Sequence, residues 1–444
     1  MPVGALNSYI SKKGYVTPDF EQIWLEPSQV QNIVTVEVTL AQVQAKLGMV
    51  PADAAQHIAH YSTISDELVE KVASGKVGNP LVAALDALRS EIPEDYRGWV
   101  HFGATSQDIL DTARALQIKS SLDWIEQQLS DLDACISKLA ETHADTLMVA
   151  RTNGQHALPT TLGTRFARWL AELRRSRSRL ADVRPRAQLI QFSGAAGTYA
   201  SMGEHGTEVA KNMAKELDLT YEPIPWHASR DSITELCCCL AIYGQTLAKI
   251  AEDLFDMQRT DFMEARETMD AHASGSSTMP QKLNPFTTMK ISVGARLAAG
   301  LAATVLTQPP GSFERDHRQL EVERDALPQI FIAVEGAAAK LLRLLPKLTF
   351  NTESLAHAAE KEGVLLLTES LMMHLAPVLG QEGAHQLLQD FAAENRAHGT
   401  GIKEFLAAHP DVVEKAGDLD WDWITRPESY LGLSERIAHD AAYS

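Results

Sequence analysis

The segment 274–285, Ser-Gly-Ser-Ser-Thr-Met-Pro-Gln-Lys-Leu-Asn-Pro, concentrates small, hydroxylic and cationic side chains between two stretches with helical spacing. Gly275 permits backbone conformations that are closed to other residues, and Ser276 supplies a hydroxyl group. Lys282 and Asn284 add a positive charge and a neutral donor, which together suit the binding of an anion. An ordinary polar connection between helices has a similar composition, because Ser, Gly, Asn and Pro are common loop residues.

A second polar cluster, His101-Phe-Gly-Ala-Thr-Ser-Gln-Asp108, forms a glycine-containing turn that leads into a helical pattern. Thr105 and Ser106 place two hydroxyl groups at a helix start, where backbone N–H groups have no partner within the helix. Such a helix start favours a carboxylate or a phosphate. The alternative is an ordinary helix cap, in which one of these side chains only satisfies the helix N–H groups.

Two further stretches are rich in polar side chains. The first is Arg151-Thr-Asn-Gly-Gln-His-Ala-Leu-Pro-Thr-Thr-Leu-Gly163. The second, 313–328, contains the elements Glu-Arg-Asp and Glu-Arg-Asp-Ala-Leu-Pro, in which the two arginines are Arg315 and Arg324. A helix that begins with so many charges is usually a solvated surface, so composition alone assigns it no chemistry.

The bulk composition restricts the class of protein. The chain has 444 residues, 45% of them hydrophobic and 22% charged, which is ordinary for a globular protein of two or three domains. A formal net charge of −18 and the lack of a basic run argue against a nucleic acid partner. We expect no membrane partner, since no apolar run approaches the roughly 20 residues of a span. The first residues lack the apolar core of a signal peptide, which predicts a cytoplasmic protein.

The four cysteines are Cys135 and the adjacent Cys237, Cys238 and Cys239. Three adjacent side chains on one helix project in different directions and cannot converge on one metal ion. We therefore expect them to be small, mostly buried helix residues in a reducing compartment.

Apolar residues recur at helical spacing over long stretches: Leu122, Ile125, Leu129, Leu132, Ile136 and Leu139, and again Leu236, Leu240, Tyr243, Leu247, Ile250, Leu254 and Met257. Nothing of comparable length alternates with the period of a strand. The pattern predicts an all-α protein built on a bundle of long helices, with few strands. We expect an N-terminal helical domain at 1–107, a central bundle domain at 108–355 and a C-terminal helical domain at 356–444.

Taken together, the polar stretches resemble the fumarase/aspartase superfamily over most of the chain, and the loop at 275–285 resembles its signature GSSxMPxKxNP. The resemblance implies that Ser276 is the catalytic base. It also implies a central five-helix bundle that pairs into the twenty-helix core of a homotetramer with composite active sites. The remaining site residues that it implies are His101, Thr105, Ser106, Thr152, Asn153, Gln155, Thr160, Lys282, Asn284, Arg315 and Arg324.

One position departs from the superfamily. Asn153 stands where the superfamily has the histidine that protonates the leaving group, and an amide cannot act as an acid. His101 is the alternative donor, whereas we expect His156 to be structural. The segments GNPLV at 78–82, GAAGT at 194–198 and PWHASRD at 225–231 resemble the 3-carboxy-cis,cis-muconate cycloisomerase branch, but Arg324 resembles the adenylosuccinate lyases.

The resemblance implies a lyase that carries out an anti β-elimination on a small, anionic, succinyl-type dicarboxylate or tricarboxylate and releases fumarate. The bond broken is carbon–nitrogen or another carbon–heteroatom bond. Neither a metal nor an organic cofactor is expected. A 3-carboxy-cis,cis-muconate cycloisomerase is the alternative. An inactive structural relative is disfavoured, because Ser276, Lys282 and Asn284 are all present.

Overall fold

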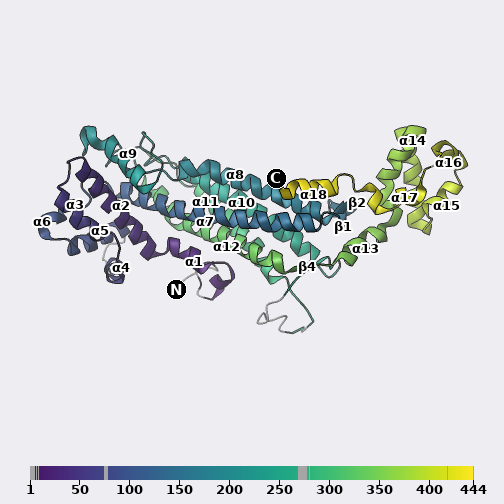
Figure 1. Cartoon of the computed structure of the whole chain (residues 1–444), viewed down its shortest axis with the longest axis horizontal. Helices are drawn as coiled ribbons and strands as arrows, with labels where there is room; N and C mark the ends of the chain where they lie inside the picture. The colour runs from purple at the N-terminus through teal and green to yellow at the C-terminus, as the bar shows by residue number, and fades with distance from the viewer. Residues whose placement is uncertain are drawn as a thin grey trace. The chain divides into compact units, whose positions relative to one another are not determined.

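The computed structural model describes residues 6, 8, 10–74, 79–268, 278–279, 281–417 and 419–443. Helices dominate this part of the chain, with two short two-stranded sheets, so the predicted all-α class is confirmed (Figure 1). The chain forms two compact units: the first holds Met1–Asp131, Leu173–Ala251 and Phe286–Leu342, and the second holds Leu132–Glu172, Glu252–Pro285 and Arg343–Ser444. Four long helices contribute to both units: α7 (Ser106–Thr142), α8 (Leu162–Ala187), α10 (Asp231–Met257) and α12 (His317–Leu344).

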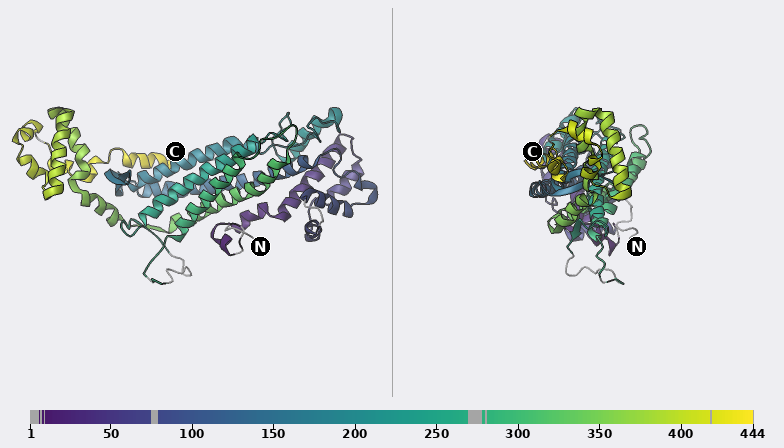
Figure 2. Two further views of the ribbon diagram at one scale, coloured as in Figure 1. Left: turned by 180° about the vertical axis from the view of Figure 1, so that it is seen from behind. Right: turned by 90° about the vertical axis from the view of Figure 1, so that its right-hand side faces the viewer.

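The helices of the first unit pack along apolar stripes, as their spacing predicts. On α10 the stripe residues Leu236, Leu240, Tyr243, Leu247 and Ile250 are fully buried. At Gly244 an added Cβ would lie 3.2 Å from the carbonyl oxygen of Ala295 on α11 (Phe286–Leu306), so this glycine lets the two helices approach closely. Within this unit, α7, α10, α11 and α12 run side by side in two views (Figures 1 and 2).

The N-terminal part of the first unit has its own core beneath α2 (Glu26–Lys46), which packs against α3 (Ala52–Ala59), α5 (Pro80–Glu91) and α9 (Gly206–Leu217). Helix α5 begins where Asn79 accepts a hydrogen bond from the backbone of Leu81 at 3.0 Å, with proline in the first turn. The remaining elements of this unit are η1 (Ser11–Gly14), α1 (Pro18–Glu21), η2 (Gln22–Trp24), α4 (Asp66–Ala73), α6 (Glu94–Arg97) and η3 (Gly203–His205).

The second unit contains both sheets. β1 (Leu147–Thr152) pairs antiparallel with β2 (Gln155–Thr161), and β3 (Ala265–Glu267) pairs antiparallel with β4 (Leu348–Phe350). A helical core follows, formed around Leu371, Leu375, Leu388, Phe391 and Phe405. Its elements are η4 (Leu345–Lys347), α13 (Thr352–Glu362), η5 (Gly363–Leu367), α14 (Thr368–His398), α15 (Ile402–Ala407), α16 (Pro410–Ala416), α17 (Trp421–Ile424), η6 (Pro427–Tyr430) and α18 (Ser434–Tyr443).

Three described segments are long and apolar enough to cross a membrane, judged by length and composition only: Asp231–Met257, Phe286–Leu306 and Thr352–His398. The expectation that no apolar run approaches a membrane span is therefore wrong. Helix α10 is this apolar because it lies in the bundle, where 56% of its most apolar window is buried inside the protein.

The predicted domain boundaries fall close to helix starts, since α7 begins at Ser106 and α13 begins at Thr352. The two compact units divide the chain differently. The division at 107 and 355 therefore stays a prediction.

Candidate active site

The start of α7 holds the first group of predicted site residues. Thr105 precedes the helix, and its backbone N–H donates to Oδ2 of Asp108 at 3.0 Å, so the aspartate in the first turn satisfies the residue before the helix. The Thr105 hydroxyl instead accepts a hydrogen bond from Nη1 of Arg315 at 2.9 Å. Ser106 is the first residue of α7 and is half-buried. Among the described residues, then, Thr105 is not an ordinary helix cap, because its side chain contacts a guanidinium rather than a helix N–H group.

The guanidinium of Arg315 is held by oxygens of the first unit. Its Nη2 donates to the carbonyl oxygen of Ala195 at 2.7 Å and to that of Gly194 at 3.5 Å. Its Nε is buried and has no hydrogen-bond partner. Within the described ranges, the contacts of this guanidinium are with neutral oxygens and no carboxylate pairs with it. A half-buried positive charge without a counterion is suited to a negatively charged ligand.

His101 lies in the turn before this helix start, with a backbone φ of 65°. Its Nδ1 is 2.7 Å from Oε1 of Glu37, whose side chain is buried on α2. The turn also needs Gly103, whose φ is +73° and where an added Cβ would lie 1.6 Å from Cε of Met202. The histidine ring is thus fixed by a carboxylate, an arrangement common for catalytic imidazoles.

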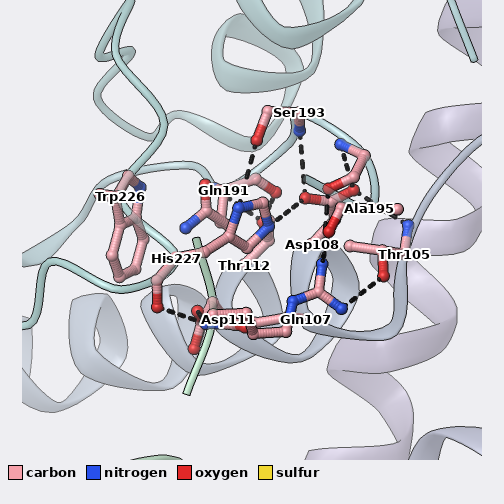
Figure 3. Close-up of polar contacts among 12 residues, drawn as sticks. Thr105, Gln107, Asp108, Asp111, Thr112, Gln191, Ser193, Ala195, Trp226 and His227 are labelled. Carbon is pink, nitrogen blue, oxygen red and sulfur yellow. Dashed lines mark hydrogen bonds and ion pairs between the residues drawn. The ribbon is translucent and has the colours of Figure 1, made fainter. Parts of the chain in front are cut away.

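Asp108 links this turn to the glycine-rich segment GAAGT. Its carboxylate accepts hydrogen bonds from the backbone N–H groups of Ser193 and Gly194, both at 3.0 Å (Figure 3). Neither Asp108 nor this backbone contact was assigned a role from the sequence, although Asp108 ends the motif HFGATSQD. An aspartate in the first turn of a helix is an ordinary capping residue, so its sequence position does not indicate its long-range partners.

Asp111 and Arg114 on α7 form a charge network with Arg230 and Glu323; Arg114 is half-buried and the other three are buried. Arg230 donates from Nη1 to Asp111 at 2.7 Å and from Nε to Glu323 at 2.9 Å, and Arg114 donates to Glu323 at 3.0 Å. Burial disfavours the charged form of Asp111, but Arg230 and Arg114 outweigh it and lower the pKa of this carboxyl group. The two opposite charges likewise outweigh burial at Arg230 and raise its pKa.

Arg324 occupies a different place in the same unit from Arg315. It pairs with Glu321 on its own helix at 3.2 Å and lines a pocket of about 580 Å³ together with Arg114, Gln117 and Trp24. The structure therefore brings Arg315 and Thr105 into contact, whereas Arg324 faces a separate cavity.

In the second unit, the hairpin β1–β2 carries the next group. Asn153 and Gly154 form its two-residue turn with φ values of 52° and 77°, and Thr152 pairs with Gln155 across it. Two successive positive φ angles define a type I′ turn, for which Asn-Gly is the preferred sequence. Thr152, Asn153 and Gln155 are exposed, and Thr160 is half-buried opposite Met148. The backbone conformation thus gives Asn153 a structural reason to be asparagine.

His156 follows this turn, and its Nδ1 is 2.9 Å from Oε1 of Glu362 at the end of α13. This pair ties the hairpin to α13 within the second unit. The contact agrees with a structural histidine.

The signature loop is described only in part. Lys282 is exposed, and Lys282 and Asn284 line a pocket of about 480 Å³ together with Arg259 and Arg266. Ser276, the predicted base, lies outside the described residues. In the described ranges, no group of three or more His, Cys, Asp or Glu side chains could hold a metal ion, and the four cysteines are free thiols.

Comparison with known proteins identifies the family of the chain. Residues 17–300 match the family model described as "Lyase". An adenylosuccinate lyase of Pyrococcus abyssi is 33% identical over 430 residues, which cover 96% of this chain and 95% of that protein. A 3-carboxy-cis,cis-muconate cycloisomerase of Bradyrhizobium diazoefficiens is 33% identical over 415 residues, which cover 92% of each chain.

Solved structures show the same fold. The crystal structure of a fumarate lyase from Mesorhizobium sp. BNC1 matches with a TM-score of 0.89 and 30% identity, covering 97% of this chain and 98% of that one. The 3-carboxy-cis,cis-muconate lactonizing enzyme from Pseudomonas putida matches with a TM-score of 0.88 and 30% identity, covering 98% of both chains. The chain belongs to the fumarase/aspartase superfamily and is an enzyme of the lyase class. Its relatives include both adenylosuccinate lyases and carboxymuconate cycloisomerases, so they leave its particular reaction open.

Proposed function

We propose that the enzyme catalyses a cofactor-independent anti β-elimination on a succinyl-type dicarboxylate or tricarboxylate and releases fumarate. One observation carries the proposal: the guanidinium of Arg315, held by neutral oxygens, lies 2.9 Å from the Thr105 hydroxyl at a helix start. Because that hydroxyl oxygen accepts from Arg315, its own hydrogen can be donated to the same substrate carboxylate. A charged and a neutral donor at a helix N-terminus suit such an anion.

In this proposal Ser276 removes a proton from the carbon next to a substrate carboxylate, and the electron pair moves into that carboxylate. The resulting dianion then expels the leaving group from the neighbouring carbon, which forms the double bond of fumarate. Preorganised donors stabilise the charge as it develops, a role we give to Thr105, Ser106, Lys282 and Asn284. Further substrate contacts are proposed for Thr152, Gln155, Thr160 and Arg324.

The proton for the leaving group needs a donor other than Asn153. We propose His101, whose ring is held by Glu37 at 2.7 Å. A carboxylate bound to Nδ1 fixes the orientation of the ring, as general acid catalysis requires. Poor leaving groups would need this proton most.

The second candidate is a 3-carboxy-cis,cis-muconate cycloisomerase, in which a substrate carboxylate adds across a double bond. One observation favours it: the lactonizing enzyme of Pseudomonas putida matches with a TM-score of 0.88. The contacting pair of Thr105 and Arg315 would serve either reaction, because both reactions require stabilisation of a carboxylate that gains charge.

We also propose that the enzyme is a cytoplasmic homotetramer whose active sites combine residues of different subunits. Helix α11 supports the association, because Met289, Val293 and Leu297 are 40–44% exposed at steps of four along one face. Phe286 and Leu306 extend the apolar surface at the two ends of the helix. The free thiols agree with a reducing compartment.

The deciding experiment offers the purified enzyme a panel of N-substituted aspartates and, separately, 3-carboxy-cis,cis-muconate. Fumarate release, followed by absorbance and absent with the Ser276→Ala variant, is the expected result. Lactone formation without any fumarate would replace the first proposal by the second. An enzyme that transforms neither class would refute both.

A further inference from the structure

The Asp108 carboxylate gathers four hydrogen bonds from three segments of the first unit (Figure 3). Oδ1 accepts from the backbone of Ser193 at 3.0 Å and from Nε2 of His227 at 2.9 Å. Oδ2 accepts from the backbone of Thr105 and from that of Gly194, both at 3.0 Å. All four partners are N–H donors, so the carboxylate acts only as an acceptor.

The contact with Asp108 fixes one hydrogen of the His227 ring. Its Nε2 must carry the hydrogen that Asp108 accepts, and its Nδ1 lies 3.4 Å from the Ser193 hydroxyl. The backbone oxygen of His227 accepts from Nε2 of Gln107 at 2.8 Å, so the loop before α10 is bound to the first turn of α7 at two points. His227 is 3% exposed and cannot itself reach a ligand in solution.

The carboxylate and Arg315 bind different groups of the same two segments. Asp108 binds the N–H groups of Thr105 and Gly194, while Arg315 binds the hydroxyl of Thr105 and the carbonyl oxygens of Gly194 and Ala195. The separation between the Thr105 hydroxyl and the Arg315 guanidinium therefore depends on the position of Asp108. His227 supplies one of the four bonds that set that position, and the only one of the four that comes from a side chain.

We propose that Asp108 and His227 are positioning residues for the anion-binding cradle formed by Thr105 and Arg315. The proposal rests on the proposed function, in which this cradle binds a substrate carboxylate. His227 acts through its Nε2–H bond to Asp108 and not through proton transfer. Loss of that one donor should shift the two cradle residues. The shift should weaken substrate binding, because rate and affinity in such sites depend on ångström-scale placement.

The test compares two replacements of similar size. The amide nitrogen of His227→Gln reaches the place of Nε2 and can still donate to Asp108, whereas that of His227→Asn falls near the place of Nδ1 and cannot. Trp226→Phe is the matched control, since it removes the neighbouring 2.9 Å hydrogen bond to the oxygen of Ile190 and leaves Asp108 untouched. Succinate is the probe, and isothermal titration calorimetry gives its Kd and the number of binding sites.

We expect His227→Asn to raise the Kd of succinate by roughly tenfold or more, as the loss of one well-placed hydrogen bond can do. His227→Gln and Trp226→Phe should stay within about threefold of wild type, a difference too small to represent a lost bond of this kind. A role in folding alone would lower the number of sites without changing Kd, and that result for His227→Asn would overturn the proposal. Equal Kd values for the Gln and Asn variants would do the same.

The two proposals can fail separately. If wild type binds succinate and Arg315→Gln abolishes binding, but His227→Asn binds as wild type does, only the positioning role is refuted. If wild type binds neither succinate nor fumarate, the carboxylate cradle itself is refuted and the positioning role falls with it.

Discussion

Replacing Arg315 by glutamine removes the charge on which the anion cradle depends. Hydrogen bonds to charged groups contribute about 1.5–3 kcal/mol, and 1.4 kcal/mol is a factor of ten, so the Kd of succinate should rise roughly 10- to 150-fold. The fold should tolerate the change, because Arg315 contacts only neutral oxygens among the described residues and glutamine can keep one such bond. We expect the free energy of unfolding to change by about 1 kcal/mol or less.

The measurement is a calorimetric titration with succinate in about 0.15 M salt, where charges farther apart than about 8 Å are largely screened. Arg318→Gln is the control, because it makes the same change of charge three residues away at a side chain that is 64% exposed and paired with Asp316 at 2.6 Å. Arg318→Gln should bind as wild type does. Equal binding by the wild type and the Arg315→Gln variant would refute the cradle.

Ser276→Ala should abolish turnover while the succinate Kd and the helical circular dichroism stay nearly unchanged, and a kcat above about a tenth of wild type would contradict the base assignment. Ser277→Ala should do much less harm. His101→Asn should slow reactions with poor leaving groups by up to roughly 10²–10⁴-fold and hardly affect good ones, because His101 is the proposed proton donor. Equal slowing across a series of β-substituted succinates would show that His101 does not donate the proton to the leaving group. Mixed Ser276→Ala and Thr152→Val subunits should regain activity through hybrid tetramers, and a mixture that stays inactive after verified exchange would count against composite sites. Arg230→Met should lower the free energy of unfolding in a urea titration by about 3–5 kcal/mol, since two buried carboxylates lose their shared partner. A loss below about 1 kcal/mol would show that this network contributes little.

Much of the helical architecture could be predicted from the sequence, because a buried helix face repeats every three or four residues. The stripe from Leu236 to Met257 on α10 is buried as this spacing requires. The hairpin at Asn153-Gly154 was missed for a different reason. Its strands are short and one of them contains Pro159, so the alternation that marks a strand is weak, although the Asn-Gly pair itself is a strong turn signal.

The sequence predicts site residues only where they belong to a recognisable local motif. Thr105 and Arg315 were selected as separate motifs, but their contact joins residues 210 positions apart, which spacing cannot reveal. Arg324 was selected by the same kind of motif and faces another cavity. Asp108 and His227 were missed because the first turn of α7 and the loop before α10 meet only in the folded chain.

The charge network of Asp111, Arg114, Arg230 and Glu323 has a consequence for how the bundle assembles. Apolar stripes on long helices can slide past one another by a turn and still bury similar surface. A slip of α12 along α7 would instead separate Glu323 from Arg114 and Arg230 and leave charges buried without partners, at a cost of several kcal/mol per ion. The four charges therefore stabilise one register of α7 and α12 relative to the shifted ones. The apolar positions around them can exchange side chains over evolution while the cradle at the start of α7 keeps its place.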